Sequence, residues 1–249
     1  MDVPFPTLVA AAALAALVVG ILKTSIGGGI GLVLAPTLSL LLPPSAALAL
    51  IAALMLLTDP FALRLYWRVW DARQLRLLLP TTLLGVAAGT VVLAMLSPLA
   101  LRRTIGVVAL AFAVAQLTLG RGGRAVFGAR PPAAVGLAVG FLMGLASTIA
   151  HSGGLVGGLY LLGLGLSSPL VLGTGVVIYS VADVLKLVGY WRIGFLDAPL
   201  VLAALLATPM LALGAWLGVR VNQRLPRRAF ELTLVAIAIA GSLRLLLAR

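Results

Sequence analysis

The sequence predicts an all-α polytopic membrane protein made of two inverted-topology repeats of about five segments each, with short broken helices after glycine-rich motifs. Three observations lead to this prediction. Of the 249 residues, 62% are hydrophobic and only 10% are charged, and the mean hydropathy is +1.20. Many of the apolar runs approach about 20 residues, the length that a helix needs to cross a bilayer. Sequence features also recur in the two halves of the chain at a nearly constant spacing.

Ten apolar segments follow one another, separated by charges or by Pro and Gly. They lie near residues 7–22, 30–42, 46–66, 76–96, 103–119, 132–150, 154–166, 169–190, 197–219 and 228–247. The segments at 30–42 and 154–166 are too short to cross a membrane, and each follows a glycine cluster. We therefore expect broken helices or half-spans that meet inside the bilayer.

The formal net charge is +12, but the arginines lie between apolar spans rather than on the face of a soluble fold, so no nucleic-acid partner is expected. Three basic loops fall on one side in the ten-segment count, and they contain Arg68, Arg73 and Arg76, then Arg121, Arg124 and Arg130, then Arg220, Arg224, Arg227 and Arg228. The positive-inside rule assigns this side to the cytoplasm. The expected location is the plasma (inner) membrane, with both termini outside.

The chain repeats itself. Asp59 precedes Tyr66-Trp67-Arg68, and Asp183 precedes Tyr190-Trp191-Arg192, at a spacing of 124 (183 − 59). Arg102-Arg103 matches Arg227-Arg228 at 125, and Pro80, Gly85 and Gly89 match Pro209, Gly214 and Gly218 at 129. We expect a first repeat at 1–120, a basic connecting loop at 121–131 and a second repeat at 132–249. An odd number of segments in each half inverts their orientation, as in secondary transporters.

Two glycine clusters at corresponding places form the candidate site. Glycine runs are tolerated in hydrocarbon where freed backbone groups meet protein, water or a ligand, and a helix that begins after such a break presents an anion-binding N-terminus. Hydroxyls, a lysine and a histidine lie beside the breaks. The candidate substrate-binding residues are Lys23, Thr24, Ser25, Gly27, Gly28, Gly29, Thr148, His151, Ser152, Gly153 and Gly154. The alternative interpretation is close helix packing through small residues.

Two carboxylates lie in or near apolar spans, where an ionised group needs a partner or water. Asp183 has Lys186 three residues further on, on the same helix face. Asp59 has Ala62 at the matching position, so it must pair with another helix, face water or stay protonated. Proton coupling through Asp59 and Asp183 is the functional interpretation, and structural pairing is the alternative. The two Tyr-Trp pairs are expected to form interfacial belts.

Several functions are excluded. There is no cysteine, and His151 is the only histidine, so thiolate chemistry and histidine-based metal sites are not expected, and neither is a cofactor. A hydrolase would need Ser and His on facing elements, whereas His151 and Ser152 are adjacent; we therefore expect no enzyme. The N-terminus lacks the basic region of a signal peptide, so we expect the first span to be retained.

Ser25-Ile26-Gly27-Gly28-Gly29 followed by Pro36, together with the repeated Asp and Tyr-Trp-Arg segments, resembles the TauE/SafE family of sulfite and organosulfonate permeases. The resemblance covers nearly the whole chain. The second half departs from the pattern, because Ala150-His151-Ser152-Gly153-Gly154 stands where another Gly-x-Gly-Gly-Gly is expected. The resemblance implies transport, often export, of sulfite, sulfoacetate or a related sulfur oxyanion.

The expected function is that of a secondary transporter, an exporter of a small anion, that works by alternating access around the two glycine-rich breaks. Two alternatives stay open: a proton-coupled importer of another small oxyanion or carboxylate, and a non-transporting membrane scaffold. The expected partners are the anion and the lipid bilayer. Coupled protons and a homodimer are left open by the sequence.

Overall fold

The computed structural model describes residues 3–25, 30–119, 131–224 and 227–247, and every regular element in these ranges is a helix. The helices are α1 (Phe5–Ser25), α2 (Ile30–Leu38), α3 (Pro44–Leu65), α4 (Ala72–Met95), α5 (Pro98–Leu119), α7 (Ala133–Ala150), α8 (Gly153–Gly163), α9 (Ser168–Arg192), α10 (Ala198–Leu206), α11 (Thr208–Arg224) and α12 (Arg227–Leu247). The all-α prediction is confirmed, and most predicted segments match a helix to within a few residues.

Six of the described helices are long and apolar enough to cross a membrane, namely α1, α3, α4, α5, α7 and α9. A seventh span is formed by α10 and α11, which bend by 46° at their junction. Large apolar side chains cover the outside, such as Met95 at 80% and Phe61 at 75% exposure, as is expected of a surface in contact with lipid. The protein is therefore an integral, multi-pass membrane protein.

The bend between α10 and α11 corrects the prediction of one continuous span at 197–219. Pro209 has no N–H to donate to the carbonyl of Leu205, and its ring crowds that carbonyl. The hydroxyl of Thr208 donates to Leu205 O instead, at 2.7 Å. The chain therefore changes direction at Ala207, and the carbonyl that proline leaves without a partner is still hydrogen-bonded.

The two short helices were predicted correctly, with 9 residues in α2 and 11 in α8. Helix α8 runs back along α7, because Gly153 lies against Met143 whereas Gly136, near the start of α7, lies against Tyr160. The two helices thus form a hairpin, which we call the α7–α8 hairpin, with residues 151–152 at its apex.

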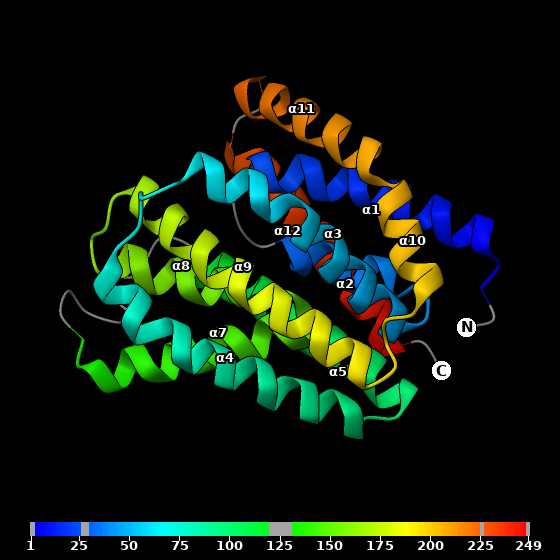
Figure 1. Ribbon diagram of the computed structural model, residues 1–249, viewed down its shortest axis with the longest axis horizontal. Coiled ribbons are helices and arrows are strands. Elements are labelled where there is room, and N and C mark those ends of the chain that lie inside the picture. The colour runs from blue at the N-terminus through cyan, green and yellow to red at the C-terminus, as the bar shows by residue number, and fades with distance from the viewer. Residues whose placement is uncertain (1–2, 26–29, 120–130, 225–226, 248–249) are drawn as a thin grey trace.

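The order of helices repeats along the chain. Helix α3 begins at residue 44 and its counterpart α9 begins at 168, again 124 residues later. Both ends of the chain lie on the same side of the bundle in Figure 1, while the connection from α3 to α4, the end of α5 and the start of α7 lie on the opposite side. This arrangement is compatible with two inverted repeats, because the first repeat starts on one side of the bundle and the second repeat starts on the opposite side.

The closest helix crossings join the two halves. Helix α4 packs along α7, and α11 packs along α1. At the first crossing a Cβ on Gly85 would collide with Phe141 O, and one on Gly144 with Thr82 O. At the second crossing the residues in the same roles are Gly214 with Leu17 O and Gly20 with Leu211 O.

The partners correspond at the spacings of the repeat. Gly20 and Leu17 lie 124 positions before Gly144 and Phe141, and Gly85 and Thr82 lie 129 positions before Gly214 and Leu211. The contact of α4 with α7 therefore has the same glycine pattern as the contact of α11 with α1, as two repeats would predict. These four glycines, which lie outside the two glycine clusters of the candidate site, allow the helices to pack closely.

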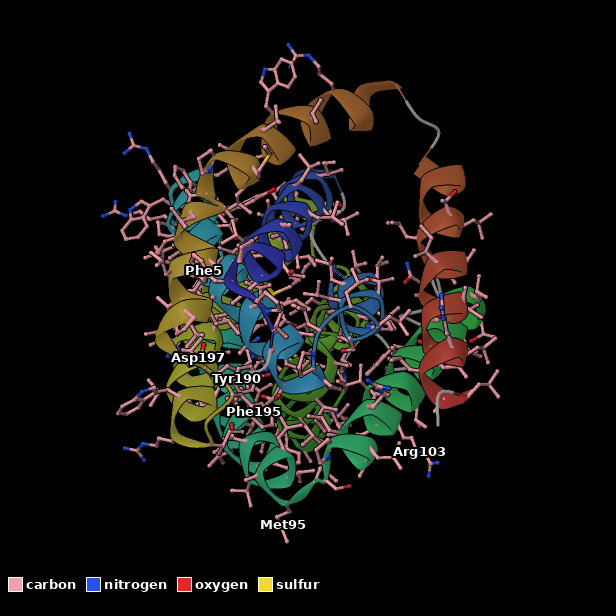
Figure 2. All side chains as sticks on the ribbon, turned by 90° about the vertical axis from the view of Figure 1, so that its right-hand side faces the viewer. Phe5, Met95, Arg103, Tyr190, Phe195 and Asp197 are labelled. Atoms are coloured by element: carbon pink, nitrogen blue, oxygen red, sulfur yellow. The ribbon has the colours of Figure 1, made fainter. Side chains whose placement is uncertain are left out.

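The bundle also has a distinct inside and outside. Figure 2 looks along the helices from the end that carries Met95 and Arg103, and both of these side chains point away from the bundle. Tyr190 and Phe195 lie within it, with their rings 6.0 Å apart. The buried apolar residues form a large cluster centred on α1, α2, α3 and α5 and a smaller one on α4, α7, α8 and α9.

Candidate functional site

The start of α2 meets the apex of the α7–α8 hairpin inside the bundle. Gly31, at the start of α2, is buried against the apex of the α7–α8 hairpin, where a Cβ on Gly31 would collide with the Cβ and carbonyl of His151 and with Ala150 O. Only a glycine lets α2 approach so closely. The candidate residues Gly27, Gly28 and Gly29 lie outside the described residues, and the side chains of Thr24 and Ser25 are likewise not described.

His151 holds the apex in an unusual backbone conformation. Its φ is 51°, in the left-handed region that glycine adopts freely and that costs other residues about 1 kcal/mol. By the 124-residue spacing His151 corresponds to Gly27 of the first half (151 − 124). A histidine therefore occupies a position whose backbone conformation favours glycine. Backbone strain of this kind persists only where the surrounding contacts hold the residue in place.

The histidine ring is fixed by two contacts and is neutral. Its Nε2 lies 3.0 Å from Leu48 O on α3, and because a carbonyl only accepts, Nε2 carries the hydrogen. The other nitrogen, Nδ1, lies 3.4 Å from the ammonium of Lys186 and accepts from it. The positive charge beside the apex therefore comes from Lys186 and not from His151.

Lys186 is the centre of a buried polar cluster. Its Nζ forms an ion pair with Asp183 Oδ1 at 2.5 Å, donates to Ser147 Oγ at 3.0 Å and lies 3.4 Å from His151 Nδ1. Of the lysines and arginines in the described part of the chain, Lys186 alone is buried, with its side chain 1% exposed. The predicted pairing of Asp183 with Lys186 is present.

Asp59 finds its partner on another helix, which is one of the three outcomes left open by the sequence. Lys23 Nζ, at the end of α1, donates to Asp59 Oδ1 at 2.8 Å and to Met55 O at 3.1 Å, and it also bonds the hydroxyl of Thr58. This pair is less enclosed than its counterpart, because the side chain of Lys23 is 21% exposed whereas that of Lys186 is 1% exposed. Asp59 lies within electrostatic range of Asp183 and Lys186.

Asp59 lines a groove between α3 and α9. Within the described residues Asp59 Oδ2 has no hydrogen-bond partner, and Ser180 Oγ in the same groove has none either. The groove has a volume of about 650 Å³ and is otherwise lined by apolar side chains such as Leu63 and Val184. Val184 is 52% exposed, so the groove opens on the outer surface of the bundle.

The remaining polar residues near the apex bond to backbone. Thr148 Oγ1 donates to Gly144 O at 2.9 Å, and Ser152 Oγ donates to Ala150 O at 3.0 Å. Ser152 makes no side-chain cap on α8, because its hydroxyl is bonded to Ala150 O. Gly153 also packs tightly on Met143 O, so it serves the hairpin as well as the break.

One aromatic prediction is wrong. Tyr190 is fully buried rather than interfacial, and its hydroxyl donates to Thr148 O at 2.5 Å. Its neighbour Trp191 is 66% exposed, and Trp67 is 63% exposed, as expected of interfacial residues. Neighbouring residues on a helix point in different directions, so a Tyr-Trp pair at a helix end places one ring inside and one outside.

A multi-pass helix bundle in which short helices begin beside buried ion pairs is an architecture found in membrane transporters. The chain matches the family described as Sulfite exporter TauE/SafE over residues 12–245, and it belongs to that family. The resemblance seen in the glycine motif is thus confirmed, and the family is one of membrane transporters. No curated protein and no solved structure matches the chain.

Proposed function

We propose that the protein is a secondary carrier that exports a small anion, sulfite or an organosulfonate such as sulfoacetate, across the plasma (inner) membrane. The observation that carries this proposal is the contact of Gly31 with His151, which places the start of α2 against the apex of the α7–α8 hairpin, beside the buried ammonium of Lys186. The mechanism that fits is alternating access, in which the two repeats at 1–120 and 132–249 exchange conformations around this meeting point.

The anion would bind where the short helices begin. Helices α2 and α8 both start at the breaks, and their N-terminal N–H groups and dipoles favour an anionic group. Thr148 and Ser152 supply hydroxyls that can turn from their backbone acceptors to the anion. Lys23 and the first glycine cluster, with Thr24 and Ser25, would complete the site from the other half.

Charge balance supports coupling to protons as part of the proposal. The two ion pairs Lys23–Asp59 and Lys186–Asp183 sum to zero, so an anion that enters leaves a net negative charge in a poorly hydrated place. A proton on a carboxylate would offset it. Asp59 is the better acceptor because its Oδ2 makes neither a hydrogen bond nor an ion pair among the described residues, whereas Asp183 Oδ1 is paired with Lys186. The charges that face Asp59 are Lys23 from α1 and Asp183 and Lys186 from α9.

The same feature favours a second candidate function, a proton-coupled importer of another small oxyanion or carboxylate. Each negative charge that leaves a cell gains about 2.3 kcal/mol per 100 mV, so export needs no coupled proton, whereas import has to overcome this term. A carboxylate that takes up a proton together with the anion would supply the missing driving force.

Flux measurements in liposomes test both functions. Purified protein is reconstituted, and the flux of labelled sulfite, sulfoacetate and sulfate is followed with an imposed membrane potential or an imposed pH gradient. Export predicts flux that follows the potential and a preference for the sulfur-containing anions tested over a carboxylate such as acetate. Import predicts accumulation that follows the pH gradient. No flux of any anion from folded, monodisperse protein would leave a membrane scaffold as the remaining function.

A further inference from the structure

We propose that Lys186 is the anion-binding cation of the second half, and that it occupies the place that Lys23 holds in the first half although it comes from a different helix. This inference rests on the proposed function and adds to it a residue that the glycine motifs do not contain. It follows from the repeat spacing, from the positions of the two ammonium groups and from the partners that surround them.

The spacing of 124 shows an exchange of residue types. Lys23 corresponds to Ser147 (23 + 124), and Ala62 corresponds to Lys186 (62 + 124), while Asp59 corresponds to Asp183. Each half therefore keeps one aspartate and one lysine. In the first half the lysine lies on the helix before the break, and in the second half it lies one helix turn after the aspartate.

The structure brings both ammonium groups to equivalent places. Lys186 Nζ lies 3.0 Å from Ser147 Oγ, so it reaches the side chain that stands at the position equivalent to Lys23. Each Nζ also contacts the Oδ1 atom of the equivalent aspartate, at 2.8 Å for Asp59 and 2.5 Å for Asp183. The helices that carry Lys23 and Ser147 are matched in space as well, because Gly20 and Gly144, three residues before each, make the same crossing.

The two ammonium groups also have matching partners. Lys23 contacts a carboxylate, the hydroxyl of Thr58 and the carbonyl of Met55. Lys186 contacts a carboxylate, the hydroxyl of Ser147 and the Nδ1 atom of His151. The hydroxyl has exchanged helices together with the lysine, since Thr58 corresponds to Ala182 and Ser147 to Lys23. The third partner differs, and in the second half it belongs to the apex itself.

A purely structural pair has no reason to keep this arrangement. Replacing a buried ion pair by apolar residues is often neutral or stabilising, so a lysine that only packed would not need to be held at the same point from a new helix. A fixed point of positive charge beside each break is what an anion site requires. Contact with the apex residue places Lys186 where an anion bound at the start of α8 would meet it.

Four variants test the inference, with thermal stability of the purified protein measured against sulfite, sulfoacetate and sulfate concentration. K186M removes the charge alone. D183N/K186M removes the pair and leaves no uncompensated carboxylate. S147K/K186A moves the lysine to α7, the arrangement of the first half. K23S/A62K makes the reverse move in the first half and tests the same equivalence there.

We expect D183N/K186M to fold but to need about 10- to 100-fold more anion for the same stabilisation, which corresponds to the loss of one hydrogen bond to a charged group. Both relocated variants should keep the anion dependence of the unaltered protein to within about threefold, and S147K/K186A should regain the thermal stability that K186M loses.

Two outcomes would overturn the inference. If D183N/K186M responds to anions as the unaltered protein does, Lys186 has only a packing role. If S147K/K186A folds but neither binds anion nor regains stability, the two places are not equivalent. Failure of the proposed function gives a different result, because the unaltered protein itself is then not stabilised by any anion. That result removes the substrate role of Lys186. The stability of S147K/K186A relative to K186M still decides whether the two lysine positions are equivalent.

Discussion

The hydroxyl of Tyr190 on α9 donates to the carbonyl of Thr148, and this contact closes the last turn of α7. The carbonyl needs a donor from outside the helix, because the N–H of Ser152, four residues on, bonds to Ala146 O instead. A buried carbonyl without a donor is costly inside a membrane. Tyr190 therefore ties the hairpin apex to the helix that carries Asp183 and Lys186.

Replacing Tyr190 by Phe should lower the free energy of unfolding by about 1–3 kcal/mol, because the ring still fills its place while the carbonyl loses its donor. The measurement is thermal unfolding of the purified protein in detergent. Trp191→Phe is the control, since that side chain is 66% exposed and should change stability little. Equal stability of Tyr190→Phe and the unaltered protein would mean that Thr148 O is satisfied by another donor.

The glycines at the two helix crossings should respond alike to a single added methyl group. Gly144→Ala places a Cβ against Thr82 O, and Gly20→Ala places one against Leu211 O, so each should destabilise the protein by about 1–3 kcal/mol as the helices move apart. Gly158→Ala is the control, because nothing lies within 4 Å of its Cβ position. Thermal unfolding of the three variants separates the effects. Because alanine is the better helix former, a similar loss for Gly158→Ala would show that something other than the helix crossing sets the result.

The backbone strain at His151 can be measured by comparing two variants that both lack the ring. His151→Ala and His151→Gly lose the same contacts with Leu48 O and Lys186, but only glycine adopts a φ of 51° without strain. His151→Gly should therefore be more stable than His151→Ala by about 1 kcal/mol. The comparison is made by thermal unfolding at one pH. If alanine is as stable as glycine here, the apex relaxes to another conformation once the ring is removed.

Asp59→Asn tests the proton-coupling proposal. Anion flux of the unaltered protein should rise as the pH falls, because protonation of Asp59 offsets the negative charge of the entering anion, and the variant should lose this dependence while Lys23 keeps an acceptor. Flux into liposomes is followed over the pH range in which the protein stays folded. Asp71→Asn is the matched control, because Asp71 caps the exposed start of α4 and asparagine caps equally well. Unchanged pH dependence in Asp59→Asn would remove Asp59 from proton coupling.

Most of the fold could be predicted because a membrane helix requires a long run of apolar residues, and charged residues, prolines and glycines mark where each run ends. Prolines and glycines mark the starts of α3 and α9, and the short lengths of α2 and α8 followed from the glycine clusters before them. The break at Ala207 was missed for a physical reason. Pro80 and Pro209 match in the repeat, yet α4 continues through Pro80 while the helix stops before Pro209. Which proline bends a helix is decided by neighbouring helices rather than by its own sequence.

The candidate site was predicted only where its contacts are local. Asp183 and Lys186 are three residues apart on one helix, so their pairing could be read from the sequence. Asp59 and its partner Lys23 are separated by 36 residues in the sequence, and Lys186 and Ser147 by 39. Such contacts join different helices, so they cannot be predicted from the spacing of residues along one helix. The repeat carried a signal for both, because it aligns Lys23 with Ser147. The inward turn of Tyr190 required knowledge of which helix face is covered.

The reciprocal grip of α4 on α7 and of α11 on α1 has a consequence for how such a chain could arise. In each proposed half, the first helix packs against a helix of the other half: α1 against α11, and α7 against α4. Neither half alone therefore contains the helix that covers its first helix. A forerunner encoding a single half would have faced the same need and could meet it only with a second copy of itself. Gene duplication and fusion then turn an assembly of two identical chains into one chain whose halves are free to diverge, as His151 and Lys186 have done on one side only.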